Sequence, residues 1–268
     1  MSTTALPTAA RRTTGTLDRS SLRLTMPRAI RAELLKLTSS RSTWFTGVAA
    51  VAVMTGISAM TSGSGGGTST LTVALAGSTF VAVLLGAFGA VAGAREFGTG
   101  LARTSLAAVP RRRTLVGAKV IALLVVVIPF AALGVVGAAV VGGGVTAGGG
   151  AAVALTDLAT LEILAAYVAY LAGTAVIGLA IGLLLRSSAG AVATTIGAFL
   201  VLPMVASLAL PAGWADLGHY LPSTAGAAMT SIGQTADGLS PAVGGTVFLA
   251  WVVVAVGSAV VALSRRDA

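Results

Sequence analysis

Six long apolar runs, separated by short polar segments, dominate the pattern of hydrophobic and polar positions along this chain. They are Trp44–Met60, Leu71–Ala94, Val120–Val141, Leu161–Leu185, Ala189–Leu210 and Ala242–Leu263. A bilayer core of about 30 Å takes ~20 apolar residues in helical form. The first run is short, and we expect it to recruit flanking Ser and Thr residues. The pattern therefore predicts an all-α integral membrane protein with six transmembrane helices.

Two different segments precede the first run. Residues 1–27 are rich in Ser, Thr and Arg and poor in apolar residues, which predicts a disordered cytoplasmic tail ahead of a single transmembrane domain, 28–268. From Arg28 to Arg41, three apolar residues recur at helical spacing: Ile30, Leu34 and Leu37. This spacing predicts an amphipathic helix, 28–41, in the membrane interface, with a solvated helix as the alternative. Its charged residues include Arg31, Glu33, Lys36 and Arg41.

A secretory signal peptide is not expected, because the first apolar run begins only near Trp44. The Arg- and Ser-rich start also fits an organelle transit peptide.

Short interruptions shape the expected helices. Only Arg186-Ser187-Ser188 separates the fourth run from the fifth, which predicts a tight hairpin. Pro129 and Pro203 lie inside the third and fifth runs and predict kinks. The patterns Gly89-xxx-Gly93 and Gly178-xxx-Gly182 favour close packing of helices, although a chain with 35 glycines forms such patterns easily by chance.

Composition excludes an ordinary soluble enzyme. Hydrophobic residues make up 56% of the chain and charged residues only 9%, and the mean hydropathy is +0.96; an average soluble domain carries about 25% charged residues. All 17 Lys and Arg residues lie before the first run, between the second and third, between the fourth and fifth, or after the sixth. By the positive-inside rule, both termini are expected in the cytoplasm. The net charge of +9 therefore indicates orientation in the membrane, and no nucleic acid partner is expected.

The residues that usually carry catalysis or bind cofactors and metals are missing. The chain has no cysteine and one histidine, which excludes thiolate sites and two-histidine zinc sites. No nucleophile elbow, dinucleotide fingerprint or P-loop is present, and the nearest fragment, Gly117-Ala118-Lys119-Val120, lacks the required glycine and hydroxyl. We therefore expect no catalytic, cofactor or metal site, and no enzyme activity, in this chain.

One ionisable residue, Glu162, lies within a predicted span, near its outer end. With Tyr167 and Tyr220 it is a candidate for a substrate pathway or outer gate. Alternatively, Glu162 reaches the outer lipid headgroups and the tyrosines are ordinary packing residues.

Residues 95–113, between the second and third runs, form the most informative polar segment. Glycines flank a stretch long enough for about two helical turns, Pro110 ends it, and a basic cluster follows. Physical chemistry alone predicts a cytoplasmic loop with a short helix that contacts lipid headgroups or a partner protein.

This segment resembles the signature of permease subunits of type-2 ABC exporters. The residues that carry the resemblance are Glu96, Gly98, Thr99, Gly100, Arg103, Leu106, Pro110, Arg113 and Lys119. The resemblance implies that they form a coupling helix held by a separate ATPase subunit. The chain departs from the family pattern in the triplet Arg111-Arg112-Arg113, so either Arg111 or Arg113 is a candidate contact to the ATPase.

Two other segments are similar to this family. Residues 31–37, continuing through Arg41 and Trp44, resemble its interfacial connecting helix. The long segment Pro211–Pro241 resembles its short re-entrant helices between spans 5 and 6, with a break at Tyr220-Leu221-Pro222.

The resemblance implies the transmembrane subunit of an ATP-driven exporter in the plasma membrane. The expected partners are an ABC ATP-binding subunit, which would hold ATP and Mg, a second permease subunit, identical or different, and membrane lipids. Apolar spans favour lipophilic cargo such as a drug, an antibiotic or a lipid. The alternative is a membrane carrier that needs no ATPase, or a membrane assembly factor; a proton-coupled carrier normally needs carboxylates near mid-membrane.

Overall fold

The computed structural model describes residues 25–62, 70–98, 112–146, 156–209, 211–231 and 238–266. Every regular element in these residues is helical. The first half contains α1 (Met26–Thr38), α2 (Arg41–Ser62), α3 (Thr70–Ala74), α4 (Ser78–Gly98) and α6 (Arg112–Thr146). The second half contains α7 (Leu158–Leu185), α8 (Ser188–Ile196), the π-helical turn η1 (Gly197–Val201), α9 (Leu202–Ala209), the 3-10 helix η2 (Ala212–Tyr220), α10 (Pro222–Met229) and α11 (Pro241–Arg266).

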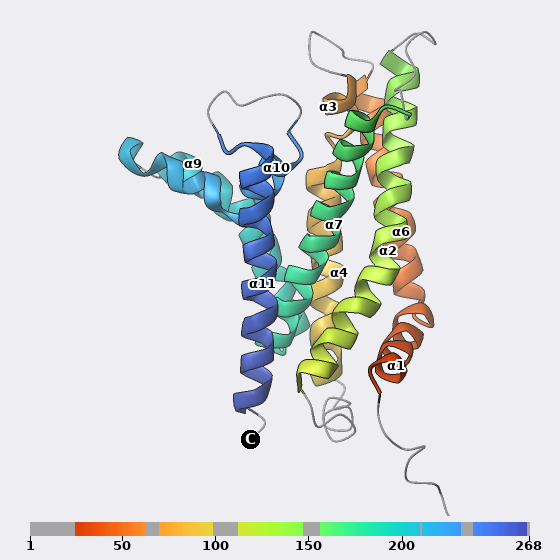
Figure 1. Ribbon diagram of the computed structural model, residues 1–268, viewed down its shortest axis with the longest axis vertical. Helices are drawn as coiled ribbons and strands as arrows, with labels where there is room; N and C mark the ends of the chain where they lie inside the picture. The colour runs from red at the N-terminus through yellow and green to blue at the C-terminus, as the bar shows by residue number, and fades with distance from the viewer. Residues whose placement is uncertain are drawn as a thin grey trace, which may run out of the picture.

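Within these residues, six segments are helical, long and apolar enough to cross a membrane. They are Arg41–Ser62, Leu71–Gly98, Arg112–Gly144, Leu158–Leu185, Ser188–Ala209 and Pro241–Arg265. The predicted all-α membrane fold with six spans is confirmed. Figure 1 shows α1, the end of α4, the start of α6, the turn between α7 and α8, and the end of α11 at the same end of the molecule. We call this end the basic end, because these elements, together with Arg41 at the start of α2, carry the Lys and Arg residues of the described chain.

The junction of α1 and α2 differs from the sequence prediction. The amphipathic helix ends at Thr38, so Arg41 begins the first spanning helix and is not part of the interfacial helix. The indole nitrogen Nε1 of Trp44 donates a 3.0 Å hydrogen bond to the carbonyl oxygen of Thr38. This bond holds one of the carbonyl groups that the end of α1 would otherwise leave exposed.

Two further boundaries differ from the predicted runs. The second run starts as the short helix α3, and the chain turns at residues 75–77 before α4 begins. The third spanning helix, α6, starts at Arg112, well before the predicted Val120, and continues through Pro129. A hydropathy pattern does not detect the polar first turns of such a helix.

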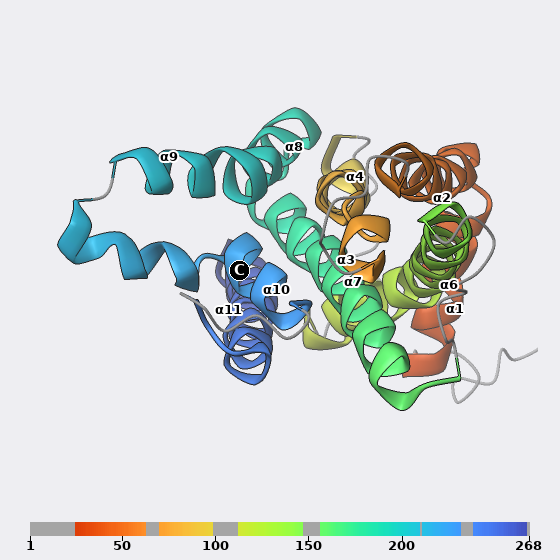
Figure 2. The ribbon, with the colours of Figure 1, turned by 90° about the horizontal axis from the view of Figure 1, so that it is seen from above.

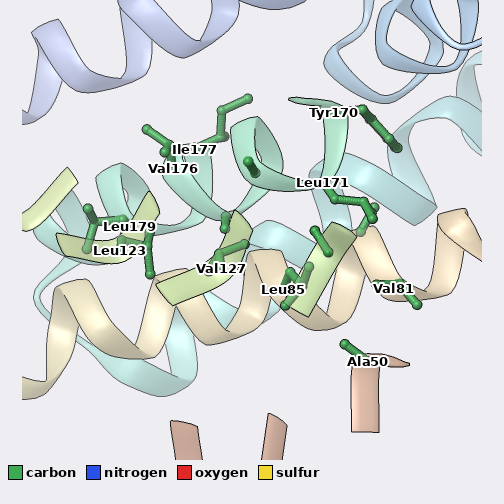
Figure 3. Close-up of a cluster of buried hydrophobic side chains, with 14 of the residues drawn as sticks. Ala50, Val81, Leu85, Leu123, Val127, Tyr170, Leu171, Val176, Ile177 and Leu179 are labelled. Atoms are coloured by element: carbon green, nitrogen blue, oxygen red, sulfur yellow. The ribbon is translucent and has the colours of Figure 1, made fainter. Parts of the chain in front are cut away.

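The core lies between α4, α6 and α7 (Figure 3). Of the six spans, α7 is the most enclosed: 67% of its most apolar 18-residue stretch is buried, against 17–39% for the others. Leu85 of α4, Val127 of α6 and Leu171 of α7 are buried in this core. The helix α7 is therefore surrounded by protein, whereas the other spans leave more surface for lipid.

Glycines bring α4 and α7 into backbone contact. A Cβ atom added at Gly89 or Gly93 would overlap a backbone carbonyl oxygen of α7, and one added at Gly178 or Gly182 would overlap a carbonyl oxygen of α4. The close packing predicted from the two glycine patterns is present. We call α4 and α7 the glycine-packed pair, in which small residues let the two backbones approach closely.

A second group of helices consists of α1, α2 and α6. The ring of Phe130 on α6 lies over Gly47 of α2 and packs edge-to-face against Trp44, with ring centroids 5.8 Å apart. Ser58 donates a buried 2.7 Å hydrogen bond to the carbonyl oxygen of Ala138. Helix α1 packs mainly on α6.

The fifth span leaves the bundle. Figures 1 and 2 show α9 projecting away from the other helices, and none of its residues is buried. The π-helical turn η1 precedes Pro203, which has no N–H group and would clash with the carbonyl of a regular α-helix. The turn therefore gives the physical reason for the change of direction.

Short helices return the chain to α11. The break between η2 and α10 falls at Leu221, next to Pro222, at the predicted position. Trp251 of α11 donates a 2.8 Å hydrogen bond from Nε1 to the carbonyl oxygen of Tyr220. The ring of Tyr170 packs on Phe248 and on Gly226, which joins α7, α10 and α11.

Candidate functional site

Four charged side chains meet at the basic end, and we call them the ion cluster: Glu33, Lys36, Glu96 and Lys119. Lys119 Nζ lies 2.9 Å from Glu33 Oε2 and 2.7 Å from Glu96 Oε1. Lys36 Nζ lies 2.8 Å from Glu33 Oε1 and 2.8 Å from Glu96 Oε1. Each ammonium group therefore contacts both carboxylates, and the cluster joins α1, α4 and α6.

The sequence of α1 places two members of the cluster on one face. Glu33 and Lys36 are three residues apart, which aligns them on a helix. Pro27 stands in the first turn of α1, where its missing N–H group costs nothing. The buried residues of α1 are Ala29 and Glu33, whereas the apolar residues Ile30, Leu34 and Leu37 are only half-buried. The predicted apolar stripe is therefore not the face that packs on the bundle.

The cluster is shielded from water to different extents. The side chain of Lys119 is 5% exposed, those of Glu33 and Glu96 are 10% and 13% exposed, and that of Lys36 is 41% exposed. Two ammonium and two carboxylate groups balance one another, which offsets the free energy of removing each charge from water. Burial opposes protonation of Lys36, but hydrogen bonds to Glu33 and Glu96 outweigh it and raise the pKa of Lys36. The Lys36 ammonium group therefore stays charged at neutral pH.

The ion cluster joins α4 to α1 and α6, two helices on which α4 otherwise packs little. Helix α4 packs on α7, and its contacts with α6 are few. Glu96 lies two residues before the end of α4, and Lys119 lies in the second turn of α6. The contact between Glu96 and Lys119 therefore holds the end of α4 against the start of α6.

The predicted coupling residues fall into three groups. Glu96 and Lys119 belong to the ion cluster. Gly98 and Arg113 are exposed, at the end of α4 and the start of α6. The others, namely Thr99, Gly100, Arg103, Leu106, Pro110 and Arg111, lie outside the described residues.

The predicted residues of the amphipathic helix also separate. Glu33 and Lys36 face the bundle through the cluster, whereas Arg31 and Arg41 are exposed. Sequence reasoning assigned the four cluster residues to two unrelated segments. The available signal was that two acidic and two basic residues lie beside apolar runs. The sequence alone does not show that these four side chains are in contact.

A cation–π contact at the basic end was missed. The guanidinium carbon of Arg186 lies 4.9 Å from the ring centroid of Phe97. The available signal was a lone arginine in a three-residue turn on the same side of the membrane as residues 95–113.

The three residues predicted at a pathway or outer gate do not form one site. Glu162 is exposed near the start of α7, with no ion pair to another described residue. Tyr167 is buried. Tyr220 is exposed at the end of η2. Among the described residues, no group of His, Cys, Asp and Glu has the arrangement that a metal ion requires.

Six spanning helices, with an amphipathic helix fixed to them by ion pairs, define a multi-pass membrane protein. The model of the ABC-2 family transporter protein matches residues 29–205, about two thirds of the chain, from α1 into α9. The chain belongs to this family, as its resemblance to ABC permeases predicted, and it is a membrane component of an ABC transporter. Membership implies association with an ABC ATP-binding subunit. A comparison with curated proteins gave no match.

Proposed function

We propose that this chain is the transmembrane subunit of an ATP-driven exporter and that the ion cluster couples it to the ATP-binding subunit. The observation that carries the proposal is that the cluster joins the end of α4 to the start of α6, the two helices that residues 99–111 connect along the chain. A partner that moves this segment acts on the end of α4 and on the start of α6 at once. Both helix ends carry a member of the cluster.

Two groups of helices supply the two-state element that such coupling needs. In this proposal the glycine-packed pair would move as one body with Glu96 at its end; close packing of its backbones supports this. Helices α1, α2 and α6 would form the other body, with Glu33, Lys36 and Lys119, and would move against α7 across the core that α6 and α7 share. Movement of residues 99–111 would shift one body against the other and exchange inward-facing for outward-facing access. The cluster favours the arrangement in which all four charges are paired.

The basic end is proposed to face the cytoplasm, where the ATP-binding subunit supplies ATP and Mg. Support comes from the positive-inside rule, because elements at this end carry the described Lys and Arg residues. The proposed membrane is the plasma membrane, and the exposed arginines of α1, α2 and α6 would lie at the level of its anionic lipid headgroups.

Lipophilic molecules such as drugs, antibiotics or lipids are the proposed cargo. The charged side chains of the described spans lie at helix ends, and the surfaces between them are apolar. A path along such surfaces suits molecules that partition into the bilayer.

A second permease subunit, identical or different, is the proposed partner of α9. This helix has no buried residues, and Leu208 is 78% exposed and Met204 64% exposed. A spanning segment that leaves its own bundle has side chains available for packing on another protein.

The test is purification of the tagged chain from a membrane that contains its natural ATP-binding subunit, followed by reconstitution in proteoliposomes. We expect both subunits in the complex, and cargo movement that requires ATP hydrolysis. Transport by the chain alone, without any ATPase, would overturn the proposal and favour a carrier.

A further inference from the structure

The turn between α7 and α8 lies against the end of α4. The guanidinium group of Arg186 covers the ring of Phe97 at 4.9 Å. Phe97 directly follows Glu96 and precedes Gly98, the last residue of α4. The cation–π contact therefore lies next to the ion cluster, on the side of α4 that the cluster does not use.

The backbone of Arg186 has an unusual conformation for a residue with a side chain. Its φ of 56° and ψ of 14° are left-handed, and it is the only described non-glycine residue with a positive φ. Glycine is the usual residue where a helix ends in this way, because a Cβ atom makes the conformation costly. The N–H group of Arg186 closes α7 on Gly182, a bond that glycine would form equally well. Helix termination does not require an arginine here, whereas the contact with Phe97 requires a cationic side chain.

The start of α8 continues this contact. Ser187 caps α8 by accepting a hydrogen bond from the N–H group of Gly190. Ala191 is fully buried against Ala90 and Ala94 of α4. Helix α8 continues through η1 into α9, so the position of the turn sets the position of the fifth span.

We propose that Arg186 is a positioning residue that holds the α7–α8 turn on Phe97, so that movement of α4 is passed to the fifth span. The proposal rests on the coupling function proposed above and adds a second route to it. The ion cluster joins α4 to α1 and α6. The Arg186–Phe97 contact joins the same helix end to α8, η1 and α9.

The first experiment separates coupling from stability in the reconstituted complex. Arg186→Gly removes the cation and relieves the backbone, so we expect a Tm within about 2 °C of wild type. The number of cargo molecules moved per ATP hydrolysed should fall about threefold to fivefold, the range of one lost cation–π contact. Phe97→Leu should show the same fall. Phe97→Tyr keeps the aromatic face, so it should keep the wild-type ratio of cargo moved to ATP hydrolysed. Arg265→Gln, at the end of α11, is the matched control.

The second experiment needs no ATPase. The chain has no cysteine, so Ala189→Cys, at an exposed position of α8, carries a single spin label. We expect restricted label motion in the wild-type background, greater mobility with Phe97→Leu, and no change with Arg265→Gln. The Phe97 variant matters most, because it leaves the backbone of residue 186 unaltered.

The outcomes distinguish the two proposals. A wild-type complex that couples ATP hydrolysis to transport, with Arg186→Gly and Phe97→Leu equal to it, overturns the role of Arg186 and leaves the proposed function standing. A loss of Tm with an unchanged transport ratio shows a purely structural contact and also overturns it. A wild-type chain that binds no ATP-binding subunit overturns both, whatever the label reports about the turn.

Discussion

Lys119 and Lys36 contact the same two carboxylates but differ in their exposure to water. Lys119 is almost fully enclosed, whereas Lys36 is 41% exposed. Removal of one member of a buried cluster leaves an uncompensated charge, while an exposed member is replaced in part by water and salt. The two lysines should therefore contribute unequally to the stability of the folded protein.

Lys119→Met should lower the Tm of the purified protein more than Lys36→Met does. We expect the free energy of unfolding to fall by about 3–5 kcal/mol for the buried lysine and by about 1 kcal/mol or less for the partly exposed one. The double variant Lys119→Met/Glu33→Gln, which restores neutrality, should recover part of the loss. Thermal unfolding in detergent measures all three, and equal losses for the two lysines would contradict this ranking.

The raised pKa of Lys36 sets the pH range of its contribution. A lysine whose pKa is raised in the folded state stabilises that state fully below its unfolded value of about 10.4. The contribution is lost only as pH rises through the raised pKa. Between pH 6 and 9, titration of Lys36 should therefore not weaken the packing of α1 on the bundle.

At the residue scale, the sequence identified the cluster residues but not their contacts. Glu96 and Lys119 were recognised by motif, and Glu33 and Lys36 by helical spacing. Their meeting depends on how α1 packs on α6, which no local pattern records. Arg186 was placed in the hairpin but not among the candidate site residues, because a single arginine in a turn satisfies the positive-inside rule without further explanation.

Close packing of α4 and α7 determines how force passes between elements. Backbone contact over Gly89, Gly93, Gly178 and Gly182 leaves no room for a side chain. Overfilling such an interface typically costs 1–3 kcal/mol, and more where the obstacle is backbone.

Gly89→Ala should lower the Tm by at least several degrees, an effect on the order of 1–3 kcal/mol. Gly257→Ala in α11 is the matched control, because an added Cβ there meets no atom within 4 Å. Thermal unfolding of both variants measures the difference in Tm between them. A Gly89 variant as stable as the Gly257 variant would show that the helices separate easily.

At the element scale, hydropathy predicted the spans well and their interruptions poorly. The six runs correspond to six spanning helices because a bilayer imposes length and apolarity on each. The turn at residues 75–77 and the π-helical turn at Gly197–Val201 lie inside apolar sequence. Pro203 signalled a kink, but not that α9 would leave the bundle.

The whole molecule exposes α9 on one side. If a second copy of this chain covers this helix, Leu208→Cys should form a disulfide-linked dimer in oxidised membranes. Leu133→Cys on α6, 62% exposed, is the control and should stay monomeric. Gel mobility without reductant measures both, and equal cross-linking would count against an α9 interface.

Orientation is a second property of the whole molecule. Asp157→Cys lies just before α7, at the end opposite the basic end, and Arg265→Cys lies near the end of α11. A membrane-impermeant thiol reagent should modify Asp157→Cys in intact cells and Arg265→Cys only after permeabilisation. The reverse result would place the basic end outside and remove the site proposed for the ATP-binding subunit.

The ion cluster also predicts how the membrane voltage affects the transporter. Its two ammonium and two carboxylate groups sum to zero charge. One elementary charge that crosses the whole field is worth about 2.3 kcal/mol per 100 mV. The two bodies that the cluster joins carry opposite single charges from it, and a small shift at one end of the bundle moves these charges across little of that field. Export of an uncharged cargo should proceed at the same rate in proteoliposomes with and without an imposed potassium diffusion potential. Coupling through these four residues would then depend on ATP and not on the membrane voltage.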